Sequence, residues 1–571
     1  MPAPNAASLR IACAQLNYTL CDFDGNARRI VEAIGRARQG GADMVVFSEL
    51  ALSGYNPQDM LEEPGFLDRQ ASAIAAVIAA TAGTDIVVLV GAVVANPGIG
   101  KRFHNAVLAM RDGRIEGVYA KRLLPNYGIF QERRWFEPGP DAHLVVEVKG
   151  IRVGVLICED AWNVDGRTYD VDPVDNVAKA GAELIVTINA SPSNVGKAAQ
   201  REALYAGLAR RWELPFLYVN QVGGNDEIVF DGASFAVQAD GAVAFRAPMF
   251  EEAIGVVAYE AGRFTAAGQA AQPAPTQSVA DDCALMYRQA TLALRDYAGK
   301  AGFSKVVVGS SGGIDSALTL ALAVDALGAA NVSAVTMPSR FSSAGSVDDS
   351  VTLCRNLGVA LHTHPIGGLY AQYVDGFQHA FDAEPSRLAR ENVQARIRGA
   401  ILMEYSNHFG ALLLTTGNKS EASCGFFTIY GDACGGLNLI GDIYKTEVFA
   451  LARYYNQRHG REIIPAVINE KAPSAELSEG QKDTDSLPPY EVLDEILKFA
   501  IEGERLRPAE YERARLAVQA LAASENTHWI ADVHRLIARS EFKRRQAAPI
   551  VRMRPRAFGA GRLMPIAAKY G

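Results

Sequence analysis

The sequence predicts an α/β fold in two large domains, the second built on a doubly wound parallel sheet. Short apolar runs alternate with helical stretches along both halves. Several of these runs are continuously apolar, as expected when helices cover both faces of a sheet. The composition shifts once, near Ala261–Asp281, which is rich in Ala, Gln, Pro and Thr. We therefore expect domains at 1–262 and 282–571, joined by a linker at 263–281.

The overall composition is that of an ordinary globular protein. Of the 571 residues, 49% are hydrophobic and 21% are charged. These values exclude a mainly disordered chain, a collagen-like repeat and a coiled coil. The formal net charge of −8 at pH 7 gives no sign of a nucleic-acid-binding surface.

Neither a secretory signal nor a membrane span is expected. The start, MPAPNAASLRIACAQ, lacks a basic segment followed by an apolar core. The longest strongly apolar run, Ile86–Ala95, is far shorter than the about 20 residues that a membrane helix needs. The seven cysteines form no CxxC pair. We expect a cytoplasmic protein with reduced thiols.

The apolar pattern places the main elements of the first half. Strands are expected at Leu9–Leu16, Met44–Ser48, Ile86–Val94, Ile151–Cys158, Leu184–Asn189 and Phe216–Asn220. Helices are expected at Asn26–Gln39, Leu67–Thr81 and Val195–Trp212.

The second half shows the same alternation. Strands are expected at Lys305–Val308, Val332–Met337, Ala360–His364 and Ala411–Thr415. Helices are expected at Asp282–Ala301, Ile314–Leu327, Val347–Leu357, Glu391–Phe409 and Thr446–Tyr455.

A cysteine stands at the end of a buried strand in the first half, where the run IRVGVLI stops at Cys158. Parallel sheets place chemistry at such strand ends, although a buried, inert thiol is the commoner fate of a lone cysteine. Two residues favour chemistry: Glu49 ends the run MVVFSE, and Lys121 lies in the loop AKRLLPNYG. A carboxylate can take the thiol proton, and an ammonium can stabilise the thiolate and then an oxyanion.

The segments FSELALSGY, KRLLPNYGIFQERRWF and GVLICEDAW resemble the nitrilase, or carbon–nitrogen hydrolase, superfamily. The resemblance covers Leu9–Val257 and implies an αββα sandwich. It also implies that Glu49 is the general base, Lys121 the oxyanion group and Cys158 the nucleophile of an amidase. Glu132 matches a second glutamate that often accompanies the lysine.

Within that superfamily, the first half resembles the glutaminase domain of glutamine-dependent NAD synthetases. In that family, glutamine is held by a tyrosine after the lysine, and by a serine and a lysine of an N-A-S-P-S-x-x-x-x-K stretch. The matching residues are Tyr127, Ser191 and Lys197. From the residues alone, Lys197 could be a solvated lysine at a helix start, and Tyr127 a packing residue of its loop.

The second half contains a Gly/Ser turn between a strand and a helix, KVVVGSSGGIDS. Small residues let the backbone approach phosphate, and a helix N-terminus favours negative charge. The turn matches neither a Walker A loop nor a Rossmann fingerprint, but it resembles the SGGxDS signature of ATP pyrophosphatases. The ATP contacts that this implies are Gly309, Ser310, Ser311, Gly312, Gly313, Ile314, Asp315 and Ser316. Asp315 could also hold Mg²⁺, a cation that prefers oxygen ligands.

A further block, TGNKSE…YGD…GDIYKTE within Leu413–Glu447, closely resembles a signature of NAD synthetases. The resemblance implies ATP contact at Thr416, and contact with deamido-NAD and magnesium at Glu421. From the residues alone, TGNKS could be a polar loop that caps a helix. Other matches are Asn392 and Lys543 for deamido-NAD, Asp432, Asp442 and Lys445 near the substrate, and the segments Lys471–Leu477 and Asp483–Tyr490 for a loop that closes over the site.

Together the resemblances imply a glutamine-dependent ligase with ATP as a substrate and Mg²⁺ as a cofactor. The first domain would hydrolyse glutamine, and the second would adenylate deamido-NAD and amidate it to NAD. The implied partners are these small molecules and further copies of the chain as a homo-oligomer, with no nucleic acid and no membrane. The alternative is a glutamine-dependent ATP-pyrophosphatase amidotransferase that acts on another carboxylate or nucleotide acceptor.

Overall fold

The computed structural model describes residues 8–266, 278–559 and 561–568. The chain divides into two compact units, Met1–Asn225 with Val229–Thr276, and Asp226–Ile228 with Gln277–Gly571. Of the predicted linker 263–281, residues 267–277 lie outside the described ranges. At its ends, Arg263–Ala266 forms strand β15, and helix α5 begins at Val279.

The first unit contains two large sheets. The seven-stranded sheet has the order β15-β14-β1-β2-β3-β4-β5, and the six-stranded sheet has the order β13-β12-β9-β8-β7-β6. The strands are β1 Ser8–Gln15, β2 Met44–Val46, β3 Val87–Ala95, β4 Phe103–Arg111, β5 Arg114–Ala120, β6 Leu144–Val148, β7 Ile151–Ile157, β8 Leu184–Asn189, β9 Phe216–Asn220, β12 Phe235–Val237, β13 Val243–Arg246, β14 Ala253–Glu260 and β15, with a separate pair β10 Val222–Asn225 and β11 Ile228–Asp231. Each sheet is parallel at its centre and antiparallel at its margins.

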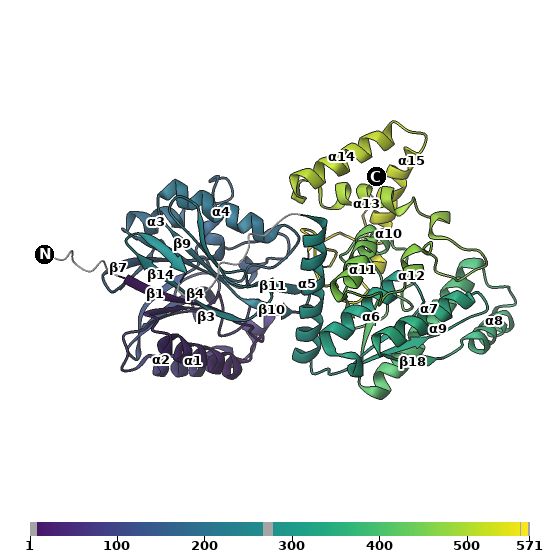
Figure 1. The fold of residues 1–571 in the computed structure, drawn as a ribbon, viewed down its shortest axis with the longest axis horizontal. Helices are drawn as coiled ribbons and strands as arrows, with labels where there is room; N and C mark the ends of the chain where they lie inside the picture. The colour runs from purple at the N-terminus through teal and green to yellow at the C-terminus, as the bar shows by residue number, and fades with distance from the viewer. Residues whose placement is uncertain (1–7, 267–277, 560, 569–571) are drawn as a thin grey trace. The chain divides into compact units, whose positions relative to one another are not determined.

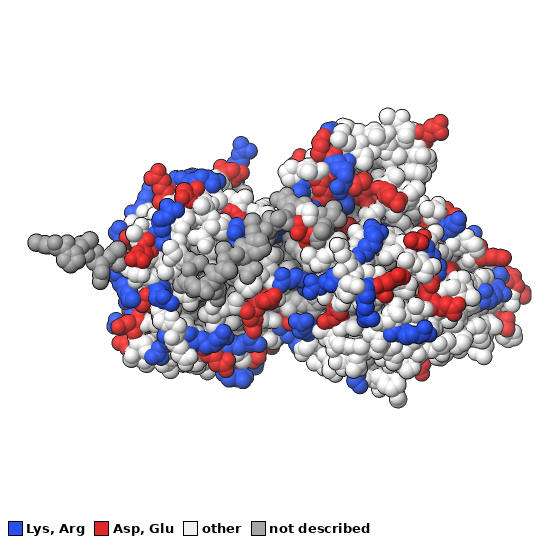
Figure 2. Space-filling model, viewed as in Figure 1, with Lys and Arg blue, Asp and Glu red and all other residues white. Residues whose placement is uncertain are grey.

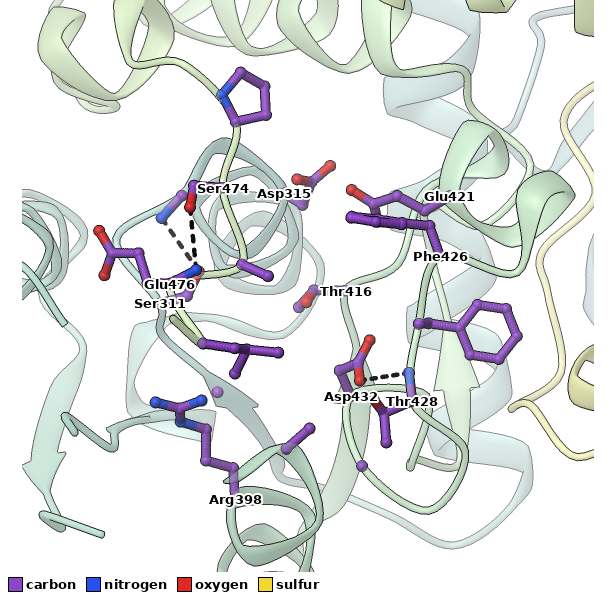
Figure 3. Close-up of a pocket in the computed structure, with 18 of the residues that line it drawn as sticks. Ser311, Asp315, Arg398, Thr416, Glu421, Phe426, Thr428, Asp432, Ser474 and Glu476 are labelled. Carbon is purple, nitrogen blue, oxygen red and sulfur yellow. Dashed lines mark hydrogen bonds between the residues drawn. The ribbon is translucent and has the colours of Figure 1, made fainter. Parts of the chain in front are cut away.

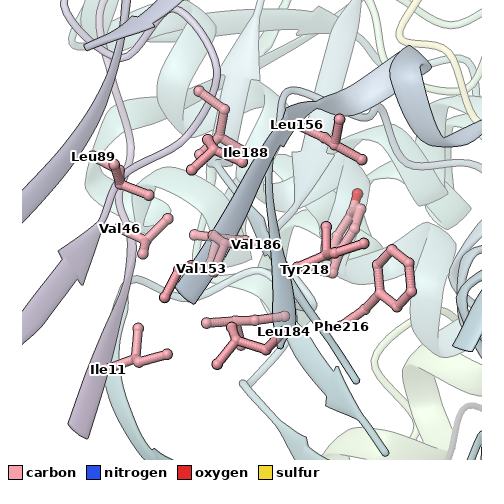
Figure 4. Close-up of a cluster of buried hydrophobic side chains, with 14 of the residues drawn as sticks. Ile11, Val46, Leu89, Val153, Leu156, Leu184, Val186, Ile188, Phe216 and Tyr218 are labelled. Atoms are coloured by element: carbon pink, nitrogen blue, oxygen red, sulfur yellow. The ribbon is translucent and has the colours of Figure 1, made fainter. Parts of the chain in front are cut away.

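Helices cover the outer faces of these sheets, which gives the αββα sandwich (Figure 1). Helices α1 and α2 lie on one side, and α3 and α4 on the other. Their bounds are α1 Phe23–Gln39, α2 Phe66–Thr81, α3 Pro173–Lys179 and α4 Lys197–Trp212, with 3₁₀ turns η1 Gln58–Glu62, η2 Glu132–Arg134 and η3 Cys158–Ala161. The sheets pack through one apolar cluster, in which Ile11, Val46 and Leu89 lie opposite Val153 and Val186 (Figure 4).

The second unit has a parallel five-stranded sheet of order β18-β17-β16-β19-β20. Its strands are β16 Val306–Gly309, β17 Val332–Thr336, β18 Ala360–Thr363, β19 Leu412–Thr415 and β20 Leu437–Asn438. The first strand in the chain is central, and the order reverses between β16 and β19. This is the doubly wound topology that the sequence predicts, and its crevice opens beyond the carboxyl ends of these two strands.

Helices surround this sheet. Helix α6 packs on β16 and β17, while α9 packs on β16 and β19. The helices are α5 Val279–Lys300, α6 Ile314–Leu327, α7 Ala344–Leu357, α8 Gly367–Phe381, α9 Arg387–Phe409, α10 Lys419–Cys424, α11 Lys445–His459, α12 Ala466–Glu470, α13 Tyr490–Ile501, α14 Pro508–Ala522, α15 His528–Arg539 and α16 Glu541–Arg544, with 3₁₀ turns η4 Ala329–Asn331, η5 Asp483–Asp485 and η6 Gly503–Arg505.

Candidate active sites

A buried ionic cluster lies at the strand ends of the first unit. Lys121 Nζ donates to Glu49 Oε1 at 2.6 Å and to both carboxylate oxygens of Glu132, at 2.8 and 2.9 Å. All three side chains are buried. The structure therefore brings together the predicted base, the predicted oxyanion group and the second glutamate.

Cys158 begins the turn η3 directly after β7, and its φ is +42°. A left-handed backbone is uncommon for a residue other than glycine and marks strain that the surrounding fold imposes. Burial first, and then the charge of Glu49, raise the pKa of the Cys158 thiol well above its ordinary value, although Lys121 acts in the opposite direction. The resting side chain is therefore a neutral thiol that needs a base.

This result refines the role expected for the lysine. The sequence predicts that the ammonium of Lys121 increases the thiolate fraction of Cys158. Two carboxylates pair with Lys121, and burial together with the charge of Glu49 outweighs the effect of Lys121 on the pKa of the thiol. Burial also raises the pKa of Glu132 to about 7. An oxyanion formed near Lys121 would then compete with these carboxylates for the ammonium.

The predicted glutamine-binding residues surround the same site. The Tyr127 hydroxyl donates a hydrogen bond to Glu159 at 2.9 Å. Burial raises the pKa of Glu159, and the positive charge of Lys197 is among the effects that lower it. Lys197 Nζ also lies 3.9 Å from the centre of the Trp162 ring. Ser191 follows Ala190, whose N–H donates to Glu49 at 3.0 Å. The three residues are therefore within the neighbourhood of Cys158, and Glu159 links two of them.

Sequence reasoning missed several polar residues here. Asn105 donates its amide to Glu49 at 2.7 Å, and the Tyr55 hydroxyl donates to Glu132 at 2.7 Å. Tyr169 joins Tyr127 on the carboxylate of Glu159. The one sequence signal for Asn105 is its position as an asparagine within the apolar run FHNAVLAMR. No sequence signal distinguishes Tyr55 or Tyr169.

The second unit has a cavity of about 420 Å³ at the crevice between β16 and β19. It lies at the position that the doubly wound topology favours for ligands. Figure 3 shows side chains from several segments pointing into it, including Asp315 and Glu421 on one side and Arg398 on another. The predicted residues that line it are Gly309, Ser310, Ser311, Gly313, Ile314, Asp315, Asn392, Thr416, Glu421 and Lys543.

Two residues of the predicted ATP loop, Gly312 and Ser316, do not line the cavity but shape the turn. Gly312 has a φ of +75°, and a Cβ there would lie 2.2 Å from the carbonyl oxygen of Ser346. The buried Ser316 hydroxyl donates to Gly313 O at 3.0 Å and accepts from Ser311 N at 3.3 Å. These contacts hold the turn open at the N-terminus of α6.

A second ionic cluster crosses the cavity. Lys445, the first residue of α11, pairs with Asp315 and lies 3.2 Å from Glu421. Asn418 donates its amide to Asp315 at 3.0 Å. Burial, assisted by Asp315 and opposed by Lys445, raises the pKa of Glu421 to about 8. The cluster therefore joins the start of α6, where Asp315 lies, to the segment after β19.

The remaining predicted contacts divide into two groups. Asn392 accepts a hydrogen bond from Thr428 at 2.7 Å, and Lys543 donates to two backbone carbonyls of the segment 425–427, so both are held at the cavity wall. Asp432 and Lys445 also line the cavity. Asp442 does not: it is buried against Lys419 at 2.7 Å and has a structural role.

Of the two segments predicted to close over the site, Lys471–Leu477 lines the cavity throughout, whereas Asp483–Tyr490 contributes only Asp483. The Glu476 carboxylate accepts hydrogen bonds from the hydroxyls of Ser343 and Ser346, at 2.9 and 2.7 Å. Both serines lie at the start of α7. Lys471 pairs with Asp349 of the same helix at 3.5 Å. Sequence reasoning identified the segment but not the serines that hold it.

The donor set of the cavity suits a hard cation. Asp315 and Glu421 offer carboxylate oxygens on one side of it, and Mg²⁺ is usually held by one or two carboxylates together with substrate phosphates. Within residues 8–266, 278–559 and 561–568, no group of three or more His, Cys, Asp or Glu side chains forms a metal site of protein ligands alone. A cation here would depend on the nucleotide for its other ligands.

Two observations concern the helices and the surface charge of the described residues. Among the described residues, no helix combines the length and apolarity needed to cross a bilayer. Lys, Arg, Asp and Glu side chains are intermixed on the face shown in Figure 2.

Comparisons with known proteins define the class. A carbon–nitrogen hydrolase family model matches residues 10–269, and a NAD synthase family model matches residues 286–547. The first half of the chain is thus similar to carbon–nitrogen hydrolases and the second half to NAD synthases. It is 44% identical to the glutamine-dependent NAD(+) synthetase of Xanthomonas campestris pv. campestris, over 100% of this chain and 99% of that one. It is 40% identical to the Synechocystis enzyme of the same name, over 98% and 99%.

A solved structure agrees with this assignment. The structure of glutamine-dependent NAD+ synthetase from Acinetobacter baumannii in complex with ADP matches with a TM-score of 0.75 and 37% identity, over 98% of each chain. The chain belongs to the family of glutamine-dependent NAD(+) synthetases.

Proposed function

We propose that the first unit hydrolyses L-glutamine to glutamate and ammonia. Glu49 takes the proton of the Cys158 thiol, and the sulfur attacks the amide carbon. Lys121 stabilises the oxyanion that forms, and ammonia leaves with a proton returned through Glu49. Water then releases glutamate from the thioester. Tyr127, Ser191 and Lys197 hold the rest of the substrate.

The second unit, in this proposal, activates the nicotinate carboxylate of deamido-NAD. The carboxylate attacks the α-phosphorus of ATP, and the turn from Gly309 to Ser316 holds the departing pyrophosphate. Ammonia then displaces AMP to give NAD. Thr416 contacts ATP, while Asn392, Glu421 and Lys543 hold deamido-NAD. Asp315 and Glu421 would hold Mg²⁺, which would neutralise phosphate charge when bound.

One observation carries the proposal: each unit has its own site. The first unit has a buried cluster of a thiol, carboxylates and a lysine, and the second has a Gly/Ser turn that lines a cavity of about 420 Å³. The test is NAD formation from deamido-NAD and MgATP, with either glutamine or ammonium as nitrogen donor. Cys158→Ala should abolish glutamine-driven synthesis and leave ammonium-driven synthesis unchanged.

Two controls make the result decisive. Cys354→Ala, which removes a buried thiol of the second unit, should leave glutamine-driven synthesis in place. If the wild type forms no NAD from either donor, deamido-NAD is the wrong acceptor. The amidotransferase that acts on another carboxylate or nucleotide acceptor would then take its place, and candidate acceptors could be screened by pyrophosphate release.

We also propose that the protein acts in the cytoplasm as a homo-oligomer. Helix α8 supports the oligomer, since none of its residues is buried and Tyr373, Phe377 and Phe381 are exposed. Sedimentation equilibrium tests this proposal. A single species at the mass of one chain, 61.2 kDa, would contradict it.

A further inference from the structure

Asp160, two residues after Cys158, is a buried hub of hydrogen bonds. Its Oδ1 accepts from the backbone N–H groups of Arg122 and Leu123, at 3.1 and 2.9 Å. Its Oδ2 accepts from Ile157 N at 3.1 Å and from the Tyr119 hydroxyl at 2.9 Å. The side chain is fully buried, with an exposed fraction of 0%. Each oxygen therefore receives two donors.

The four donors come from two segments of the chain, one next to Lys121 and one next to Cys158. Tyr119, Arg122 and Leu123 all lie within two residues of Lys121, and Ile157 directly precedes Cys158. The contact with Ile157 could be explained by capping of the short turn η3. Capping does not explain the other three, which come from a segment about 40 residues earlier in the chain. Asp160 thus connects the strand end that carries Lys121 to the strand end that carries Cys158.

We infer that Asp160 is a positioning residue for glutamine hydrolysis: its carboxylate fixes the lysine segment and the cysteine turn at one separation. This inference rests on the function proposed for the first unit. The buried lysine has few ways to adjust by itself, because Glu49 and Glu132 already engage its Nζ. A small shift of the loop backbone would therefore change where the ammonium lies relative to the attacked carbonyl.

The ionised form of Asp160 is the one that fits this role. Burial raises the pKa of Asp160 to about 6, against the lowering effect of Leu123 N–H and Lys121. Above this pH, four donors meet four lone pairs. Asparagine has nearly the same shape, but its NH₂ would replace one oxygen. In either orientation the NH₂ would face two donors, so the connection would be broken on the lysine side or the cysteine side.

The test measures glutamine hydrolysis and NAD formation for Asp160→Asn and Tyr119→Phe. We expect Asp160→Asn to lower kcat for glutamine hydrolysis by about 100-fold, the loss typical of a misplacement of about 1 Å. KM for glutamine and the rate of ammonium-driven synthesis should remain near the wild-type values. Tyr119→Phe, which removes one of the four bonds, should give a smaller loss of kcat. Tyr259→Phe is the matched control, because it removes a hydroxyl that donates to the backbone of Glu183.

Wild-type hydrolysis is measured first: its absence overturns the proposed function itself, whereas an unchanged kcat in Asp160→Asn overturns only this inference. A loss of kcat that Tyr259→Phe reproduces, or that falls equally on ammonium-driven synthesis, also overturns it, because the residue would then be merely structural. If Asp160→Asn does not fold, Tyr119→Phe decides. A lowered kcat at unchanged KM supports the positioning role, and an unchanged kcat refutes it.

Discussion

At the residue scale, the first site is dominated by two carboxylates that share one buried lysine. Taking charges out of water is costly, and the attraction between them offsets this cost only while every partner is present. Glu49 and Glu132 are two carboxylates paired with a single ammonium, that of Lys121. When both are ionised, the cluster carries a net negative charge. An oxyanion formed on a substrate beside Lys121 would add a further negative charge to the cluster.

We predict that Lys121→Met abolishes glutamine hydrolysis and lowers the free energy of unfolding by about 3–5 kcal/mol near neutral pH. Burial already raises the pKa of Glu132 to about 7, and removal of the Lys121 charge, which lowers that pKa, should raise it further. A carboxyl group with a raised pKa in the folded state favours folding at low pH and opposes it once the pH rises through that pKa. The loss measured by chemical denaturation should therefore be smaller near pH 5 than near pH 8.

The control for this variant is Lys149→Met. Lys149 pairs with Asp43 but is more than half exposed, so its removal should change stability by less than about 1 kcal/mol. An equal loss at both pH values in Lys121→Met would show that the buried carboxylates are not the source of the destabilisation.

A second prediction concerns Glu421, whose pKa is raised to about 8. A protonated carboxyl must release its proton before it can bind Mg²⁺. Mg²⁺ affinity of the ATP-bound protein should therefore fall as the pH drops below 8, by up to about tenfold per pH unit. Calorimetric titration at several pH values measures this slope. Glu421→Gln should weaken binding and flatten the slope, whereas Glu491→Gln, an exposed residue of α13, should change neither.

At the element scale, the turn between β16 and α6 depends on one backbone conformation. Gly312→Ala should raise KM for ATP by at least about tenfold, because the new Cβ combines a strained φ with a backbone contact at 2.2 Å. Glutamine hydrolysis should persist. Gly302→Ala is the matched control: it has a φ of +83° but open space, so it should lower stability and leave KM for ATP unchanged.

Several of the elements that position the two sites could be predicted from the sequence. Continuous apolar runs identify central strands, and the strand Leu184–Asn189 and the helix Ile314–Leu327 have the predicted bounds. β5 was missed because its sequence RIEGVYA is largely exposed and lacks an apolar run. Helix α8 was missed because no buried face sets a helical period.

The same reasoning explains which site residues could be predicted. Glu49 and Cys158 could be located because each follows a recognisable strand. Asp160 could not, since its partners come from another segment of the chain and only the fold brings them together. Asp442 is the reverse case: it lies within a family motif, yet it is buried against Lys419, away from the cavity.

At the scale of the whole molecule, two units with separate apolar cores should lose structure separately. A substitution of Arg554 can destabilise the second unit selectively. Its buried guanidinium donates hydrogen bonds to Glu447, Glu502 and Glu510, all in the second unit. Arg554→Met leaves these carboxylates short of one cation and should cost about 3–5 kcal/mol.

The expected result is selective inactivation by heat. Samples of Arg554→Met heated in steps should lose ammonium-driven synthesis at a lower temperature than the wild type, with glutamine hydrolysis lost at the wild-type temperature. Arg515→Met, which removes an exposed partner of Glu512, should follow the wild type in both assays. Simultaneous loss of both activities in Arg554→Met would contradict independent unfolding of the units.

The left-handed backbone at Cys158 has an evolutionary consequence. A residue with a Cβ in that conformation costs about 1–2 kcal/mol relative to glycine. Folding alone would favour glycine there, so the nucleophilic role proposed for Cys158 would have to be maintained by selection against a locally unfavourable conformation. In a lineage supplied with enough ammonium, this position would be among the first to drift, and its loss would make the fold more robust. Glutamine use is thus maintained against the stability of the domain that provides it.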